Sequence, residues 1–258
     1  MFKFIAKNKA LPFFIRRAYY SAFGIELRRA NGDYFTHVLS AVGLKCKRTL
    51  DYYIDELLYD DVLRSYYELA LDRKLIKDKY AGDYGARIAR EGNLVNYYAL
   101  VRELEPRILV ETGTATGSMT SWILSALHKN QHGKLISIDI PPEKGKLTMD
   151  MSISREQVGF LIPHAYRQNW EYVEGDAKLF LQDVLINNNV DVFIHDSLHT
   201  YDHMMFEYVT ARGLMKKDTV IMSDDILWNN AWTDFVRGHK LNAISCEDSP
   251  NLGLLVNR

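Results

Sequence analysis

Residues 107–118 read RILVETGTATGS, an apolar run followed at once by a glycine-rich turn. Short apolar runs of this kind form buried strands. Gly113 and Gly117 permit a tight turn and let the backbone approach a ligand closely. Residues 118–129 have the pattern of a helix, and the free amide groups at a helix start favour an anionic group. The stretch predicts a strand, a ligand-binding turn and a helix, with a plain connecting turn as the alternative.

The same alternation of apolar runs and helical segments continues along the chain. Strands are predicted at 134–139, 170–175, 190–196 and 218–224, helices over about 177–186 and 201–215, and a final strand pair at 241–246 and 252–257. Strands that alternate with helices form parallel βαβ units. The sequence therefore predicts an α/β fold with a doubly wound, mostly parallel seven-stranded sheet. Ligands of such sheets bind at the carboxyl ends of the strands.

The N-terminal part of the chain has a different, helical texture. Residues 50–75 place apolar and aromatic side chains at three- and four-residue spacings, which predicts one amphipathic helix. Residues 93–105 predict another helix, ended by Pro106. We expect an N-terminal helical extension or cap over residues 1–92 and a main domain over residues 93–258.

Charge divides the chain in a similar way. The first fifty residues hold ten lysines and arginines against two acidic residues, although the whole chain has a formal net charge of −1. The overall balance argues against a nucleic-acid partner. The basic, aromatic N-terminal segment predicts a helical cap or the arm of a homodimer, with peripheral contact to an anionic membrane as the alternative.

The cellular location is indicated by the cysteines and by the hydropathy pattern. Cys46 and Cys246 form no metal-type pair and favour a reducing compartment over a disulfide framework. The sequence has no secretory-signal pattern, and no run approaches the roughly 18 apolar residues that span a bilayer. We expect a cytoplasmic protein, with membrane association through the N-terminal segment as the alternative.

Acidic residues follow the second and third predicted strands. Asp139 ends the second strand, where a carboxylate can accept hydrogen bonds from both ribose hydroxyls of a nucleotide. Gly175, Asp176 and Ala177 follow the third strand. Asp176 can accept a hydrogen bond from the exocyclic amine of adenine, can cap the next helix, or can do both.

Together these segments resemble class I S-adenosylmethionine-dependent methyltransferases: E-x-G-x-x-x-G at 111–117, Asp139 after the second strand, and G-D-A at 175–177. The resemblance covers about residues 93–258 and implies a Rossmann-like fold that binds S-adenosyl-L-methionine. It implies that the glycine turn holds the amino-acid part of the cofactor, Asp139 the ribose and Asp176 the adenine. The cofactor-binding residues that it indicates are Glu111, Gly113, Thr114, Ala115, Gly117, Ser118, Asp139, Asp176, Ala177 and Asp196. Ala115 departs from the family pattern, which most often has glycine there, and we expect a local adjustment of the backbone without loss of binding.

Three aspartates follow the fourth and fifth predicted strands, namely Asp196, Asp224 and Asp225. If these strands are neighbours, the carboxylates can converge, and carboxylates in one cleft repel each other unless a cation joins them. Oxygen ligands suit Mg²⁺ or Mn²⁺. The arrangement resembles metal-dependent O-methyltransferases of the catechol and sugar-modifying types. The D-x-x-H-x-Y segment at 196–201 and the S-D-D segment at 223–225 are similar to the sugar-modifying branch. This resemblance implies that the three aspartates hold the metal.

His199 is the candidate general base, because it stands three residues after Asp196, where the catechol-type enzymes have their basic residue. Its alternative role is to order the loop or to bind a ligand carboxylate. The spacing of His195, His199 and His203 is that of a zinc site, but His195 belongs to the predicted strand and no H-E-x-x-H frame is present. We therefore do not predict zinc.

Acceptor specificity is expected in the long crossover between the second and third strands, which should contain a helix and a flexible loop. Its candidate acceptor contacts are Arg155, His164, Tyr166 and Arg167. Trp228 and Trp232 are expected to be ordinary core residues at helical spacing, with an aromatic wall beside the acceptor as the alternative.

The function predicted from these residues is a Mg²⁺-assisted O-methyltransferase that acts on a hydroxyl of a small-molecule or glycan-type acceptor. Two alternatives stay open because a fold does not fix an activity. One is the methyltransferase fold with a metal-independent acceptor. The other is a non-catalytic cofactor-binding or scaffold protein anchored by its basic N-terminus.

Overall fold

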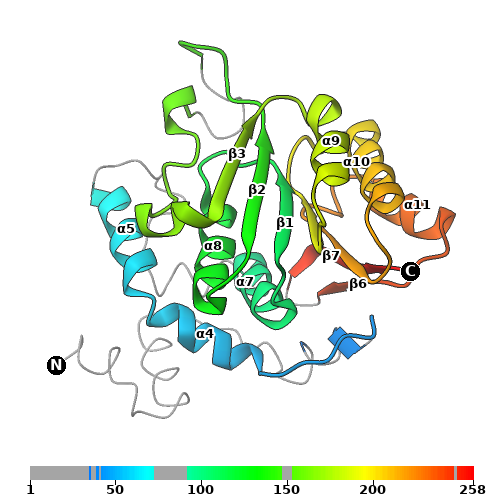
Figure 1. Cartoon of the computed structure of the whole chain (residues 1–258), viewed down its shortest axis with the longest axis horizontal. Helices are drawn as coiled ribbons and strands as arrows, with labels where there is room; N and C mark the ends of the chain where they lie inside the picture. The colour runs from blue at the N-terminus through cyan, green and yellow to red at the C-terminus, as the bar shows by residue number, and fades with distance from the viewer. Residues whose placement is uncertain (1–34, 36–38, 41, 73–91, 147–152, 247–248) are drawn as a thin grey trace.

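A seven-stranded sheet with the strand order β3-β2-β1-β4-β5-β7-β6 forms the centre of the molecule (Figure 1). This computed structural model of the chain describes residues 35, 39–40, 42–72, 92–146, 153–246 and 249–258. The strands are β1 (Ile108–Thr112), β2 (Lys134–Asp139), β3 (Trp170–Glu174), β4 (Val192–His195), β5 (Thr219–Ser223), β6 (Ala243–Cys246) and β7 (Ser249–Asn257). The first five strands pair in parallel, and β7 runs antiparallel to both β5 and β6. The predicted doubly wound, mostly parallel sheet is confirmed.

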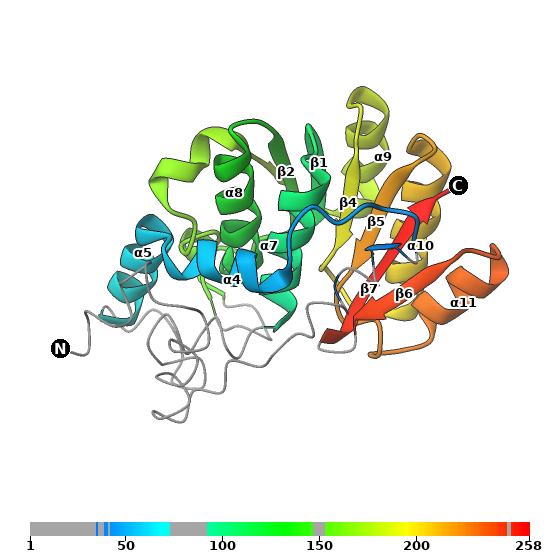
Figure 2. The same ribbon diagram turned by 90° about the horizontal axis from the view of Figure 1, so that it is seen from below.

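Helices cover both faces of the sheet and divide the core into two clusters (Figures 1 and 2). One cluster holds α7 (Gly92–Leu104) and α8 (Ser118–Asn130), and the other holds α9 (Ala177–Asn187), α10 (Tyr201–Leu214) and α11 (Ala231–Gly238). Successive strand residues point to opposite faces, so Leu109 of β1 joins the first cluster and Val110 joins the second. Successive residues at the end of one strand therefore point to the two opposite faces of the sheet.

The single helix predicted over residues 50–75 is wrong, because two helices are present: α4 (Leu50–Leu58) and α5 (Asp61–Asp72). The helix is interrupted at Asp60, which is buried. Its carboxylate accepts hydrogen bonds from the backbone N–H of Leu63 at 2.9 Å and from the Tyr166 hydroxyl at 2.7 Å. An aspartate that bonds to nearby backbone groups competes with the helical hydrogen bonds. Its partner Tyr166 is distant in sequence, so periodicity alone could not locate the break. Residues 73–75 lie outside the described part of the chain.

The described part of the N-terminal extension packs against the helices α7 and α8. Buried residues of α4 and α5 belong to the same hydrophobic cluster as α7 and α8, and α4 lies beside α7 (Figure 2). Most of the basic segment lies outside the described residues. The predicted roles of this segment as a cap, a dimer arm or a membrane contact therefore stay predictions. None of the helices described here is long and apolar enough to cross a membrane.

The crossover from β2 to β3 covers the glycine turn. Its described residues form two short 3-10 helices, η2 (Arg155–Gln157) and η3 (His164–Asn169), and no α-helix, so the predicted helix is not found in residues 140–146 and 153–169. The backbone of this segment instead pairs with the turn: Gly159 N–H donates to the Ala115 carbonyl and Leu161 N–H to the Thr116 carbonyl, both at 2.9 Å. These bonds hold the crossover over the predicted ligand turn.

Candidate functional site

The glycine turn between β1 and α8 lies directly against the end of β4. Gly113 has a φ of +87°, and a Cβ atom built on it would lie 2.1 Å from the Asp196 carbonyl oxygen. Only glycine permits both this left-handed conformation and this close approach. The contact brings the turn and the first of the predicted metal ligands together, as the strand order β1-β4 requires.

The rest of the turn is shaped by Gly117 and Ala115. Gly117 is the N-cap of α8 in the left-handed conformation, and a Cβ there would lie 2.7 Å from the Ile162 side chain. Ala115 has a φ of +45°, a left-handed conformation that costs a non-glycine residue energy. Its N–H donates to Asp139 Oδ2 at 3.0 Å, which ties the turn to the end of β2.

Glu111 is a fully buried carboxyl beneath the turn. Its Oε1 accepts hydrogen bonds from the hydroxyls of Thr120 at 2.7 Å and Ser137 at 2.6 Å, whereas Oε2 has no partner among the described residues. Burial raises the pKa of Glu111 to about 7, against the opposing effect of the two hydroxyl donors. The charge of Asp139 raises the pKa further. A buried acceptor atom without a partner marks a place that a ligand donor can fill.

Asp176 caps α9, with its carboxylate accepting from the backbone N–H of Lys178 at 2.8 Å. The helix-cap role is confirmed, and the adenine contact stays a prediction. The preceding Gly175 donates its N–H to the Asp139 carbonyl at 2.9 Å, so the ends of β2 and β3 are joined at the edge where the cofactor is expected.

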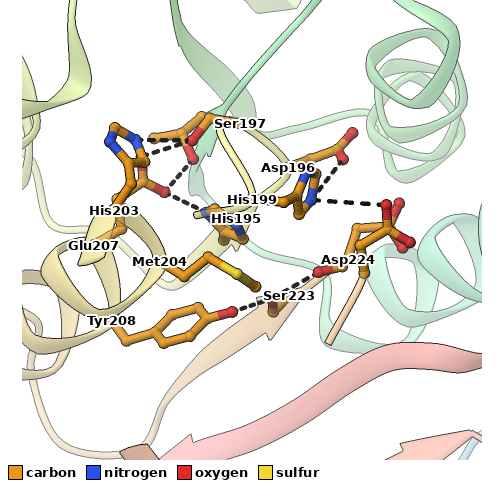
Figure 3. Close-up of polar contacts among 12 residues, drawn as sticks. His195, Asp196, Ser197, His199, His203, Met204, Glu207, Tyr208, Ser223 and Asp224 are labelled. Atoms are coloured by element: carbon orange, nitrogen blue, oxygen red, sulfur yellow. Dashed lines mark hydrogen bonds and ion pairs between the residues drawn. The ribbon is translucent and has the colours of Figure 1, made fainter. Parts of the chain in front are cut away.

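Acidic side chains gather around His199 at the ends of β4 and β5. His199 Nε2 lies 3.9 Å from Asp196 Oδ1 and 3.9 Å from Asp225 Oδ2 (Figure 3). Burial raises the pKa of Asp196 well above its ordinary value, and the neighbouring charge of Asp224 raises it further. Asp225 has a φ of +48°, a strained conformation of the kind that clusters at functional sites. Two of the three aspartates predicted as metal ligands, Asp196 and Asp225, thus lie close to His199.

The cluster is not a preformed metal site. Within the part of the chain that the structure describes, no three His, Cys, Asp or Glu side chains are placed so as to hold a metal ion. Asp196, Asp224 and Asp225 nevertheless offer the hard oxygen donors that Mg²⁺ prefers. Burial, and to a smaller extent the charges of Asp224 and Asp225, raise the pKa of Asp196. A cation between carboxylates relieves the repulsion among them. The three carboxylates supply oxygen donors of the right kind, but in the described residues they are not arranged around one point.

A buried hydrogen-bond network that the sequence did not predict lies beneath His199. Glu207 of α10 accepts hydrogen bonds from the side chains of Thr112, His195, Ser197 and His203 (Figure 3). The two outer histidines of the zinc-like spacing, His195 and His203, are thus hydrogen-bonded to Glu207. The sequence signal was the i,i+4 spacing of His203 and Glu207 on the inner face of a helix.

The crossover candidates for acceptor binding take structural roles. Tyr166 as an acceptor contact is wrong, because its side chain is 1% exposed and its hydroxyl donates to Asp60. Arg167 lies over the Trp170 ring and donates to the Gly159 carbonyl at 2.9 Å. Arg155 forms an ion pair with Glu174, and His164 makes an edge contact with Tyr66.

The two tryptophans differ sharply in exposure. Trp232 is 6% exposed and packs in the core against Tyr208 and Phe235, so it is not part of an acceptor wall. Trp228 is 70% exposed, and its ring centroid lies 6.0 Å from that of His199. Of the pair, only Trp228 stands beside the candidate base.

Residues 110–226, which include the glycine turn, Glu207 and the acidic cluster, match the family model described as a methyltransferase domain. This segment of the chain is therefore similar to a methyltransferase domain. The enzyme class expected from the sequence, an S-adenosylmethionine-dependent methyltransferase, is confirmed. A search of the curated proteins finds no match to the chain.

Solved structures share the fold of this methyltransferase domain at low sequence identity. A methyltransferase of Podospora anserina bound to S-adenosylhomocysteine has a TM-score of 0.52 at 12% identity, with 75% of this chain and 86% of that chain covered. A putative O-methyltransferase of Klebsiella pneumoniae has a TM-score of 0.51 at 17% identity, with 81% and 96% covered. A TDP-rhamnose 3'-O-methyltransferase of calicheamicin biosynthesis has a TM-score of 0.53 at 13% identity, with 80% and 92% covered. These likenesses concern the fold alone.

Proposed function

We propose that the methyltransferase domain transfers the methyl group of S-adenosyl-L-methionine to a hydroxyl oxygen, with a divalent cation, Mg²⁺ or Mn²⁺, held by Asp196, Asp224 and Asp225. The acceptor is a small molecule or a glycan. The observation that carries the proposal is the position of His199. Its Nε2 atom lies 3.9 Å from the carboxylates of Asp196 and Asp225, and Asp196 in turn lies against Gly113 of the glycine turn. A base and an acidic cluster thus adjoin the place where the cofactor is expected.

The cofactor side of the site is built from the ends of β1, β2 and β3. Bound S-adenosylmethionine supplies a methyl group on a positively charged sulfur. The N–H groups at the start of α8 face its carboxylate, and Asp139 accepts from the ribose hydroxyls. Glu111 Oε2, buried and without a partner in the described residues, is the acceptor available to a ligand N–H group. Asp176 stands where the adenine amine is expected, and its second carboxylate oxygen stays available while the first caps α9.

On the acceptor side, His199 takes the proton from the hydroxyl as the oxygen attacks the methyl group. General-base catalysis of this kind contributes roughly 10²–10⁴-fold to the rate. Asp196 and Asp225 stabilise the imidazolium that forms, because opposite charges within this distance favour the charged form. A divalent cation, when bound, lowers the pKa of a coordinated hydroxyl and orients it.

The acceptor surface beside His199 is apolar. Trp228 is 70% exposed, Leu227 66% and Leu198 58%, and these residues belong to the two loops that follow β4 and β5. The Asn229 side chain donates to the His199 carbonyl at 3.1 Å and joins the two loops. A ring-shaped acceptor can stack on Trp228 while its hydroxyl faces His199. This geometry supports a sugar or phenol ring over a flexible aliphatic alcohol.

A transfer assay with methyl-labelled S-adenosylmethionine tests the proposal. The purified chain is incubated with catechols and with nucleotide sugars, in the presence of Mg²⁺, Mn²⁺ or a chelator. Product that forms with metal and disappears with chelator supports the proposal. Asp224→Ala should abolish this turnover but spare S-adenosylhomocysteine binding, measured by calorimetry. The exposed Asp183→Ala serves as the control. Turnover that is equal with metal and with chelator would favour a metal-independent acceptor instead.

A further inference from the structure

Glu207 is the centre of a buried network that the proposed chemistry does not use. Its side chain is fully buried, and each carboxylate oxygen accepts two hydrogen bonds. Oε2 lies 2.6 Å from Thr112 Oγ1 and 2.6 Å from His195 Nδ1. Oε1 lies 2.8 Å from Ser197 Oγ and 2.8 Å from His203 Nε2. A buried carboxylate requires this degree of hydrogen bonding to be stable.

The network fixes the direction of every hydrogen bond in it. Burial raises the pKa of Glu207, but the hydrogen bonds from His195, His203 and Thr112 outweigh it and lower the pKa to about 2. The side chain is therefore a carboxylate, which can only accept hydrogen bonds. Each partner must donate, so His195 carries its proton on Nδ1 and the Ser197 hydroxyl points toward Glu207.

The partners of Glu207 lie at the strand ends that build the site. Thr112 is the last residue of β1, pairs in register with His195 of β4, and directly precedes Gly113 of the cofactor turn. Ser197 lies in the loop after β4, between Asp196 and His199 in sequence. One side chain thus ties the cofactor turn and the loop that carries the candidate base to the same helix.

The His195 ring lies between Glu207 and His199 (Figure 3). Its centroid is 5.2 Å from that of His199, with an angle of 75° between the ring planes. Because Nδ1 is bound to Glu207, the other nitrogen is Nε2, which is buried without a partner among the described residues. Side chains whose only role is to fill a core rarely leave a buried nitrogen unpaired. The His195 ring, held in one orientation by Glu207, therefore packs against the His199 ring and fixes its position.

We propose that Glu207 is the positioning residue of this enzyme: through Thr112, His195 and Ser197 it holds the ends of β1 and β4 so that His199 stays between Asp196 and Asp225. The inference rests on the proposed role of His199. It assigns no contact with the acceptor to Glu207, which acts only through the side chains that it binds.

The direct test is the pair of variants Glu207→Gln and Glu103→Gln. Glutamine keeps the shape but replaces one acceptor oxygen with a donor NH₂ group, so two of the four donors around residue 207 lose their acceptor. Glu103 is a matched control: it is 6% exposed and accepts from Tyr53 Oη, Lys47 N and Arg48 N, each at 2.7 Å. It lies near the end of α7, ahead of the start of β1, whereas His199 follows the far end of the neighbouring strand β4.

Nitrogen-15 NMR of the histidine rings gives a readout that needs no acceptor. In the wild-type chain, His195 should show the Nδ1–H tautomer. In Glu207→Gln that tautomer signal should be lost and the ring resonances of His199 should shift, whereas Glu103→Gln should leave both unchanged. With the acceptor found in the transfer assay, Glu207→Gln should lower kcat by about 10- to 100-fold, as supporting residues of active sites do. The KM for S-adenosylmethionine should change little.

The outcomes separate this inference from the proposed function. If the wild-type chain transfers no methyl group to any acceptor, the proposed function fails, and the NMR comparison still decides the role of Glu207. The inference is overturned if the His199 resonances of Glu207→Gln match those of the wild-type chain. It is equally overturned if the two glutamine variants lose the same amount of turnover, because Glu207 would then serve stability alone.

Discussion

Replacement of Gly113 by alanine should damage both stability and cofactor binding, and the structure gives the size of the effect. The residue has a φ of +87°, which costs a non-glycine residue roughly 1–2 kcal/mol. The new Cβ would also lie 2.1 Å from the Asp196 carbonyl oxygen, so the end of β4 must retreat by about 1.3 Å to restore an ordinary 3.4 Å contact. Overpacking of this kind costs about 1–3 kcal/mol. The expected loss of unfolding free energy is therefore about 2–5 kcal/mol.

Two other glycines separate these contributions. Gly145 has a φ of +80°, but no atom of the described residues lies within 4 Å of the position that a Cβ would take. Gly145→Ala should therefore lose only the roughly 1–2 kcal/mol of backbone strain. Gly213 lies inside α10 with a normal helical φ and open space around it, so Gly213→Ala should gain about 0.5–1 kcal/mol. The difference between Gly113→Ala and Gly145→Ala measures the contact with β4 alone.

Urea unfolding gives the free energies, and calorimetric titration with S-adenosylhomocysteine gives the affinities. Because a shift of about 1 Å at a binding site can cost 10²-fold, Gly113→Ala should bind the ligand at least tenfold more weakly, whereas the other two variants should bind it normally. Equal losses of stability in Gly113→Ala and Gly145→Ala would refute the close approach of β1 and β4. Normal ligand affinity in Gly113→Ala would refute the placement of the cofactor at this turn.

Three further substitutions test the site. Glu111→Gln should flatten the pH dependence of stability. The pKa of Glu111 is raised to about 7, so the stability that its protonated form contributes is fully present below the ordinary pKa of 4.5 and is lost as pH rises through 7. Melting temperatures measured between about pH 5 and 8 without cofactor would show this difference. Trp228→Ala should raise the KM for the acceptor with almost no change in melting temperature, and an unchanged KM would exclude stacking on this ring. His199→Gln should lower kcat by about 10²–10⁴-fold with S-adenosylhomocysteine affinity retained, and an unaltered single-turnover rate would remove it as the base.

The cofactor turn and the acidic cluster were predictable because parallel strands bring their carboxyl ends to one edge. Once residues 107–112, 190–196 and 218–224 are identified as neighbouring strands, the residues that follow them must meet. The contact of Gly113 with Asp196 and the approach of Asp196 and Asp225 to His199 follow from that rule.

Features that depend on partners distant in sequence could not be predicted. The break between α4 and α5 depends on Asp60, whose partners Ser125 of α8 and Tyr166 of η3 are distant in sequence. Trp228 and Trp232 are four residues apart and look equivalent on a helix. The helix begins only at Ala231, so Trp228 lies in the preceding turn and is exposed, while Trp232 packs inward.

Two buried carboxyl groups with opposite behaviour flank the end of β1: Glu111 of β1 on one face of the sheet and Glu207 of α10 on the other. Glu111 points toward α8 and receives two neutral hydroxyl donors, and its pKa rises to about 7. The next residue, Thr112, points toward α10 and donates to Glu207, whose four donors include two imidazoles and whose pKa falls to about 2. Burial is nearly the same for both groups, so the number and kind of donors decide the difference. The carboxyl on the cofactor side can therefore gain or lose a proton near neutral pH as a ligand enters. The carboxylate that supports the base loop keeps its charge, and with it the arrangement of that loop.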